Sequence, residues 1–207
     1  MLKDKMHDSC TDCTACNQKH PLFGLLNDDE LTEINTKRFE VSFAAGEMLF
    51  KQGSPASHLV CVTSGLVKIY MEGSNDKNLI FKIAKATELF GGPGTFVDSR
   101  HHYSAKALTN TTACFIEVGG FKHLLRTNIP FNEAFLVGIS KNSLFMHERF
   151  YTNAYKQMHG RLAEALIYLS KQVYLENPFL MHLSRVDLAE LTGLSRESVI
   201  RILKEFK

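Results

Sequence analysis

Three cysteines near the N-terminus have the residue type and the spacing to bind a metal. Cys10, Cys13 and Cys16 are each separated by two residues, and the 207-residue chain contains five cysteines in all. An odd number of closely spaced cysteines, in a chain without a signal peptide, favours metal binding or redox chemistry over structural disulfides.

The last 24 residues contain a second informative pattern, typical of two short helices around one tight turn. Ser184 is a candidate N-cap, and Asp187 three residues later comes close to completing a capping box. Gly193 can adopt the positive φ that a sharp turn between helices requires, and Ser195 is a good N-cap for the second helix. Small and apolar residues fill the shared core of this predicted helix-turn-helix: Leu188, Ala189, Leu194, Val199 and Ile202.

The second of these helices would enter the major groove of double-stranded DNA with its first residues facing the base edges. Arg196, Glu197 and Arg201 are the polar residues of its exposed face. Arginine can donate two hydrogen bonds to guanine, and glutamate can accept one from the cytosine amino group. Ser195 and Arg185 are suited to phosphate contacts, which position the protein without reading sequence. A solvated helix face is the alternative interpretation of each charge.

Residues 23–128 must form the scaffold in front of this motif. Apolar runs of strand length alternate there with turn signals such as Ser64-Gly65 and Gly91-Gly92-Pro93-Gly94. Many short strands at this spacing predict an all-β sandwich or barrel. The clearest runs cover residues 47–50, 58–62, 66–71, 79–83 and 113–118.

Helical patterns connect the two parts. Residues 131–158 contain no proline and one glycine, and Val137, Leu144, Tyr151 and Met158 recur every seven residues. This predicts a long helix with an apolar stripe that is either a two-helix interface or a face packed on its own domain. Leu162, Ala165, Leu166, Leu169 and Val173 then mark a second amphipathic helix.

Composition limits the class of protein. Hydrophobic residues make up 44% and charged residues 22% of the chain, as in an ordinary folded protein of one or two domains. The formal net charge is +2, so any DNA-binding charge must be local. Without an apolar run of about 20 residues or a signal peptide, we expect a cytoplasmic protein with no membrane contact. The sequence has no nucleophile–base pair and no phosphate-binding loop, so we expect no enzyme activity.

From Phe23 to Lys207 the chain resembles the CRP/FNR superfamily of bacterial transcription regulators. Gly46–Gly53, Val62–Val67 and Phe90–Gly94 are similar to the effector-binding β-roll of that family, and His159–Ala163 and Leu194–Leu203 to its DNA-binding domain. The resemblance implies an α+β fold with a cyclic-nucleotide-binding-like β-roll (a jelly roll), a long dimerisation helix and a winged helix-turn-helix.

The resemblance also implies boundaries and partners. We expect a Cys-rich arm at 1–22, the β-roll at 23–128, the dimerisation helix at 129–158 and the helix-turn-helix domain at 159–207. The partners implied are a second copy of the chain, RNA polymerase and palindromic double-stranded DNA. The chain ends at Lys207, before the β-hairpin wing of the family, so we expect a truncated domain.

The implied effector pocket departs from that of the members that bind cyclic AMP. Those members have a Glu where this chain has Gly92, and an Arg-Ser pair where it has Tyr103 and Ser104. Their Thr-Ser pair on the dimerisation helix aligns with Met146 and His147. A buried phosphate without a guanidinium partner carries a heavy desolvation cost, so we expect an effector other than cyclic AMP.

The cysteines resemble those of the FNR branch, whose N-terminal cysteines and one β-roll cysteine hold an oxygen-labile [4Fe–4S] cluster. Cys10, Cys13 and Cys16 have tighter spacing than in that branch, and Cys114 aligns with the β-roll ligand. The run is also similar to that of bacterial ferredoxins, with His20 in place of the last cysteine. Zinc bound by the three cysteines with His20 or Cys114, and thiols without metal, remain alternatives.

Together these features predict a sequence-specific transcription regulator that senses oxygen, nitric oxide or redox state through a cluster. The trio on the second helix resembles that of the cyclic-AMP receptor branch, which implies TGTGA-like half-sites. One alternative is a regulator that binds a small molecule in the β-roll and has no cluster. Another, from a different class, is a metal or redox-relay protein without specific DNA binding.

Overall fold

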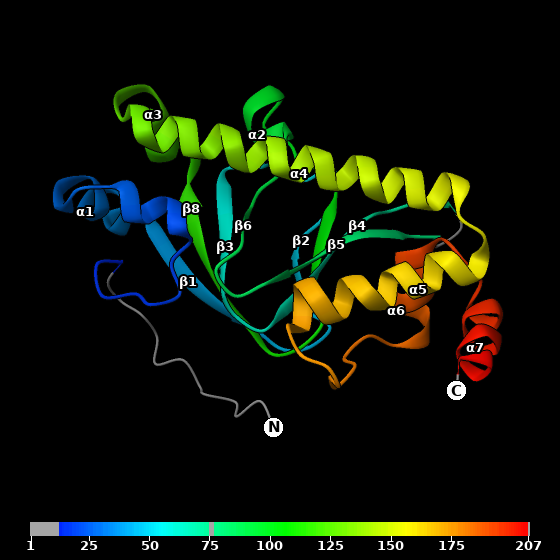
Figure 1. The fold of residues 1–207 in the computed structure, drawn as a ribbon. Helices are drawn as coiled ribbons and strands as arrows, with labels where there is room; N and C mark the ends of the chain where they lie inside the picture. Colours follow the sequence, from blue (N-terminus) through cyan, green and yellow to red (C-terminus); the bar gives the residue numbers. More distant parts are fainter. Residues whose placement is uncertain (1–12, 75–76, 207) are drawn as a thin grey trace.

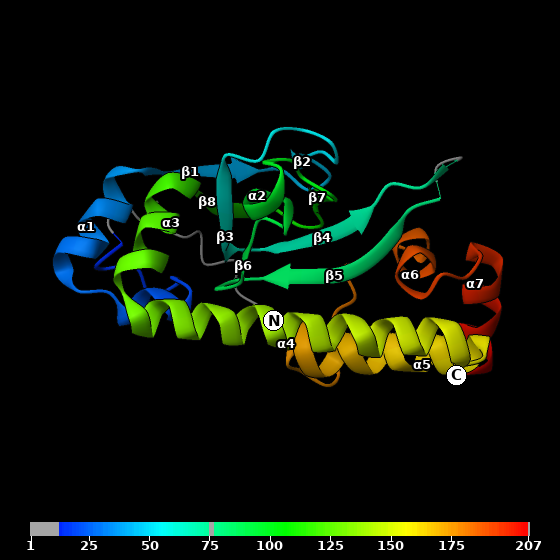
Figure 2. The ribbon, with the colours of Figure 1, turned by 90° about the horizontal axis from the view of Figure 1, so that it is seen from above.

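A computed structural model describes residues 13–74 and 77–206 (Figure 1). A β-roll lies at one end, helices α6 and α7 lie at the other, and one long helix runs beside both (Figures 1 and 2). None of the helices in the described ranges is long and apolar enough to cross a membrane.

The β-roll consists of two antiparallel sheets of four strands each, in the orders β1-β8-β3-β6 and β2-β7-β4-β5. The strands are β1 (Arg38–Phe43), β2 (Met48–Phe50), β3 (His58–Ser64), β4 (Leu66–Met71), β5 (Leu79–Lys85), β6 (Leu89–Phe90), β7 (Ser104–Ala107) and β8 (Thr111–Glu117). Five of them, β2 to β5 and β8, coincide with the apolar runs that predicted strands. The last run extends one residue past the end of β8, because Val118 begins helix α3 instead.

Strand β3 is an inner strand of its sheet, and it is buried on both faces. Leu59 and Cys61 pack into one apolar cluster and Val62 into another, as the alternation of side chains along a strand requires. Gly65 makes the turn into β4 with φ of +83°, and a Cβ at this position would lie 2.4 Å from the carbonyl oxygen of Asn110. This turn therefore needs glycine.

Helices cover the roll and extend beyond it. Before and within the roll lie η1 (Pro21–Leu25), α1 (Asp28–Thr36), α2 (Gly94–Val97) and α3 (Val118–Thr127). After it come α4 (Ile129–Tyr155), α5 (Met158–Tyr168), the π-helical turn η3 (Leu169–Tyr174), α6 (Arg185–Thr192) and α7 (Arg196–Glu205).

The long helix α4 corrects one expectation. The sequence pattern predicted a single helix over 131–158, but α4 ends at Tyr155 and Met158 begins α5. Lys156 is extended, with ψ of 142°, and its carbonyl oxygen accepts a hydrogen bond from Nε of Arg161 at 2.9 Å. Met158 therefore lies outside the helix that carries Val137, Leu144 and Tyr151, and we define the apolar stripe of α4 as these three residues.

A shared core joins the roll to the C-terminal helices. Tyr70, Ile80 and Ile83 of the β4–β5 hairpin belong to the same buried cluster as residues of α5, α6 and α7. Figure 2 shows this hairpin extending from the roll toward α6, and β5 contacts α6. The C-terminal helices are therefore packed against the β-roll as well as against α4.

Candidate functional site

The helix-turn-helix forms as its sequence predicts. The side chain of Ser184 accepts a hydrogen bond from the backbone N–H of Asp187, and Asp187 completes the capping box. Gly193 has φ of +65°, and the side chain of Ser195 accepts from the N–H of Ser198 at 3.1 Å. The predicted core residues Leu188, Val199 and Ile202 are fully buried. Local capping and turn residues therefore set the angle at which α7 leaves α6.

The predicted DNA-contact residues are all exposed on the two helices of this motif. Arg196, Glu197 and Arg201 are exposed on α7, and Arg185 is exposed at the first position of α6. Ser195 is exposed at the N-terminus of α7, where unpaired backbone N–H groups favour an anion such as a phosphate. The five side chains are therefore each accessible to a ligand from solvent.

Two residues that sequence analysis missed, Lys68 and Arg149, hold this motif in place. On β4, Nζ of Lys68 lies 2.7 Å from Asp187 and 3.0 Å from Glu190 of α6. Glu190 also accepts a hydrogen bond from Asn78 at 3.1 Å. Lys68 looks like any charged strand residue in the sequence, and no local signal connects it with a helix 119 residues away.

The second missed residue is Arg149, a buried guanidinium on α4. It donates a hydrogen bond to the carbonyl oxygen of Leu191, in the last turn of α6, and its Cζ lies 5.7 Å from the ring centre of Tyr168. The Tyr168 hydroxyl accepts a hydrogen bond from the N–H of Ile83 on β5 at 2.9 Å. Burial lowers the pKa of Arg149, and its carbonyl partner at a helix C-terminus favours the cation. Helices α4, α5 and α6 and strand β5 are thus joined at one point.

Of the residues of the implied effector pocket, His147 lines one of the two cavities described below, and the other four line neither. Tyr103 is buried inside the roll against Phe50 and Phe81, and burial raises its pKa well above the ordinary tyrosine value. Gly92, with φ of +85°, lies against the Tyr103 ring. Aromatic side chains therefore pack closely around these two members of the predicted set.

The other three members of that set have different surroundings. Ser104 is buried and donates a hydrogen bond to Glu72. Met146 is half-buried on α4, and His147 is exposed and lines an open cavity of about 420 Å³ near Tyr151.

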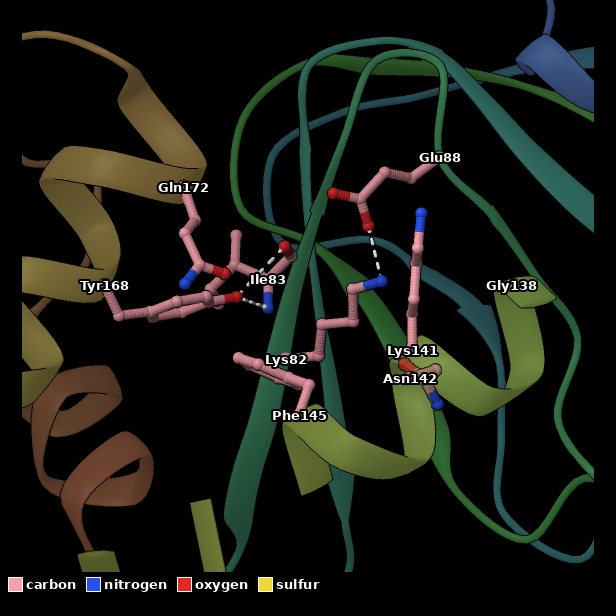
Figure 3. A pocket seen from close by; sticks show the side chains of 9 residues that line it. All are labelled: Lys82, Ile83, Glu88, Gly138, Lys141, Asn142, Phe145, Tyr168 and Gln172. Atoms are coloured by element: carbon pink, nitrogen blue, oxygen red, sulfur yellow. Dashed lines mark hydrogen bonds and ion pairs between the residues drawn. The ribbon is translucent and has the colours of Figure 1, made fainter. Parts of the chain in front are cut away.

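A cavity of about 260 Å³ lies elsewhere, between β5, α4 and the α5–η3 segment (Figure 3). Lys82 in its wall pairs with Glu88 at 2.7 Å, and the Tyr168–Ile83 hydrogen bond closes one side. Lys141 forms no ion pair with any residue that the structure describes. The full lining is Lys82, Ile83, Glu88, Gly138, Lys141, Asn142, Phe145, Tyr168 and Gln172.

Cysteines of the described ranges gather on and beside strands β3 and β8. Cys114 on β8 lies directly opposite Cys61 on β3, and burial raises the pKa of both thiols to about 12. Cys13 packs on the same apolar cluster, and Cys16 is buried. Both buried thiols are close enough to Cys13 and Cys16 for electrostatic interaction. Cys10 lies outside the described residues.

The remaining groups around these thiols have structural partners. Arg38 donates a hydrogen bond to Sγ of Cys114 at 3.3 Å. His20, the alternative ligand, accepts a hydrogen bond from the N–H of Leu22 through Nδ1, and burial lowers its pKa. Across 13–74 and 77–206, no three Cys, His, Asp or Glu side chains are arranged to hold a metal ion.

Comparisons with known proteins match both halves of this architecture. Residues 40–128 match the family model of the cyclic nucleotide-binding domain, and residues 160–207 match the Crp-like helix-turn-helix domain. The cAMP-activated global transcriptional regulator CRP of Haemophilus influenzae is 30% identical, over 78% of this chain and 74% of that protein.

Two other relatives extend the match. The transcriptional activator protein Anr of Pseudomonas protegens is 27% identical, over 96% of this chain and 82% of its own length. The structure of FixK2 from Bradyrhizobium japonicum has the same fold, with a TM-score of 0.75, 18% identity and coverage of 82% of this chain and 84% of that one. The predicted α+β fold class is confirmed, and the chain belongs to the CRP/FNR superfamily of transcription regulators.

Proposed function

We propose that the protein is a homodimeric regulator that reads palindromic double-stranded DNA through Arg196, Glu197 and Arg201. The observation that carries this proposal is the exposed α7 face, which presents two guanidiniums and one carboxylate above a fully buried core. Arg185 and Ser195 flank that face and would contact phosphates. RNA polymerase is the protein partner that the family suggests.

Replacing Arg196 by Ala should weaken binding to a TGTGA-like half-site by about 1–3 kcal/mol and relax the preference for one guanine. The reason is the loss of a two-hydrogen-bond contact with a base edge. Fluorescence anisotropy with the operator and its single-base-pair variants, at one fixed salt concentration, measures this effect.

The matched control is Arg185→Ala, which removes the same charge from a predicted phosphate contact. It should weaken binding to every sequence alike and reduce the salt dependence. Uniform weakening by Arg196→Ala would make Arg196 a phosphate contact instead. Equal affinity of the wild-type chain for operator and random DNA would support the metal or redox-relay alternative.

The sensory input is a separate proposal, and cyclic AMP is a poor candidate for it. Tyr103 occupies the position of the arginine that grips the cyclic phosphate in the family, and aromatic rings pack around it. A phosphate there would lose its hydration without gaining a cation.

We propose instead that Cys10, Cys13, Cys16 and Cys114 hold a [4Fe–4S] cluster. The described members of this set fit it in chemistry, because cysteine sulfurs, which become soft thiolate ligands when they bind a metal, gather around Cys114. They would have to approach one another more closely than in this structure. When bound, such a cluster supplies reactivity toward oxygen and nitric oxide, and the roll supplies Cys114 from a rigid strand. Zinc bound with His20 or Cys114 is the alternative.

Protein purified without oxygen should therefore contain about four iron and four sulfide per chain. Cys114→Ser should lose most of this iron, because the ligand on the rigid strand is removed. Iron, sulfide and zinc analysis with the visible spectrum measures the content. Cys61→Ser is the matched control, since it changes the neighbouring buried thiol and should retain the iron. Equal iron in both variants would contradict the assignment, and stoichiometric zinc would support the alternative.

A second candidate for the input is an anionic small molecule bound in the cavity of Figure 3. The specific observation is Lys141, which has no ion-pair partner among the described residues and lines this cavity together with Asn142 and Gln172. Such a ligand would touch β5, α4 and η3 together. Metal-free protein from the anaerobic preparation would favour this input over the cluster.

A further inference from the structure

Glu205, the last residue of α7, has a different partner for each of its carboxylate oxygens. Oε1 accepts a hydrogen bond from Nη1 of Arg201, one helical turn earlier, at 2.8 Å. Oε2 lies 2.6 Å from Nε2 of His159, which is the second residue of α5. The carboxylate therefore connects the predicted base-reading arginine to a separate helix, 46 residues away in the chain.

Arg201 has another carboxylate at the same spacing that it does not use. Glu197 lies one turn before Arg201 on α7, but Glu197 forms no ion pair with the described part of the chain. On an isolated helix, a glutamate placed four residues before a cation is the better orientation of such a pair. Local helix preference alone would thus favour Glu197, whereas the observed pairing is with Glu205.

The contact with His159 explains why Arg201 pairs with Glu205 instead of Glu197. Its hydrogen bond with Glu205 fixes the carboxylate from the side of α5, and the His159 ring lies 6.2 Å from that of Phe206. The hydrogen bond from His159, followed by that from Arg201, holds the pKa of Glu205 below its ordinary value, so Glu205 is charged at neutral pH. All three side chains are about half exposed, so these ion pairs add little to stability. Their main effect is on the orientation of the side chains.

We infer that Glu205, fixed by His159, is a positioning residue that directs Arg201 toward its base and keeps Glu197 free for its own. This inference rests on the proposed function, in which Arg201 and Glu197 contact base edges. A guanidinium drawn toward the end of α7 cannot neutralise Glu197. The carboxylate of Glu197 then remains available to a cytosine amino group.

The test is Glu205→Gln, with affinity measured on the operator, on its single-base-pair variants and on random DNA. Discrimination at the base pairs read by Arg201 and Glu197 should fall about five- to tenfold. Affinity for random DNA should rise, because a negative charge leaves the surface that faces phosphates. A purely structural role would lower both affinities together, and that result would overturn the inference.

Three further variants complete the test. His159→Ala should reproduce the loss of discrimination, and His159→Gln, which keeps an N–H donor, should restore part of it. Glu164→Gln is the matched control, because it removes the same charge from a partly exposed ion pair with Lys156, neither member of which belongs to α7, and it should leave discrimination unchanged. A loss in the control equal to that in Glu205→Gln would contradict the inference.

Arg201→Ala separates this inference from the proposed function. If Arg201→Ala leaves discrimination unchanged, the assignment of Arg201 as a base-reading residue is wrong and the inference falls with it. If Arg201→Ala lowers discrimination but Glu205→Gln does not, the proposed function stands and only the inference is wrong. In the Arg201→Ala background, Glu205→Gln should cause no further loss at the base pair assigned to Arg201.

Discussion

Replacing Lys68 by Met should lower the free energy of unfolding by about 3–5 kcal/mol. The ammonium of Lys68 lies between Asp187 and Glu190, and all three side chains are only 12–14% exposed. Removing the cation leaves two carboxylates in a poorly hydrated interface with no positive partner. The cost comes from those uncompensated charges rather than from the loss of an attractive contact. Urea denaturation followed by circular dichroism measures the change.

A matched variant tests whether the effect is specific to the interface between the roll and α6. Lys82 forms a pair of the same length with Glu88, but that pair is about one quarter exposed and lies within the roll. Lys82→Met should therefore cost only about 1 kcal/mol or less. Amide hydrogen exchange should increase across α6 in the Lys68 variant alone. Equal destabilisation by both variants would show that the Lys68 cluster has no special role.

The pH dependence of this difference has a definite sign. Burial raises the pKa of Asp187, but hydrogen bonds from Lys68 and Ser184 outweigh it and bring the value below that of an ordinary carboxyl group. Asp187 therefore contributes stability above the ordinary carboxyl pKa, and this contribution is lost as the pH falls through the lowered value. Burial lowers and the two carboxylates raise the pKa of Lys68, with a net increase, so its contribution is lost only at high pH. The wild type and the variant should differ most near neutral pH and converge in acid.

The same cluster connects the proposed sensory part of the molecule with the DNA-binding part. Lys68 holds α6 from the roll through Asp187 and Glu190, and Arg149 holds the last turn of α6 from α4. A shift of α4 relative to the roll would therefore change the position of α6, and with it α7, because the two anchors lie on different elements. Coupling of this kind needs no contact between an effector and the DNA-binding helices.

Features encoded within a few residues were predictable from the sequence. Ser184, Gly193 and Ser195 specify the two helices and their turn by capping and by positive φ, and each has the predicted role. Longer strands such as β3 and β4 were also predicted from their apolar runs. The two-residue strand β6 was not, because such a short segment has no periodic pattern.

Features that depend on tertiary contacts were not predictable from the sequence. The long helix ends at Tyr155, where Lys156 is extended and its carbonyl oxygen accepts a hydrogen bond from Arg161. No proline or glycine marks this position in the sequence. The opposition of Cys61 and Cys114 follows from the register of β3 against β8. The partners of Lys68 and Arg149 lie on another domain, and their sequence neighbourhoods look like ordinary solvated surface.

Replacing Leu144 by Glu should convert the proposed dimer into a monomer. Val137, Leu144 and Tyr151, the apolar stripe of α4, are more than half exposed in the single chain, and such a stripe gains stability by burial against a second copy. A carboxylate at Leu144 would then face its symmetry mate across the interface without a cation. Size-exclusion chromatography with light scattering measures the change in mass.

The effect on DNA binding should be comparable with or larger than that of any single base-reading residue. A dimer binds two half-sites about 34–36 Å apart, and the second half-site contact is intramolecular once the first has formed. A monomer loses this advantage, so affinity for the full palindrome should fall about 100-fold or more, while affinity for one isolated half-site stays unchanged. Leu180→Glu is the matched control, because Leu180 is more exposed than Leu144 but lies in the loop before α6. If Leu144→Glu still forms a dimer, or if both variants lose dimerisation equally, α4 does not form the interface. Another contact between the two copies would then have to set the distance between their α7 helices.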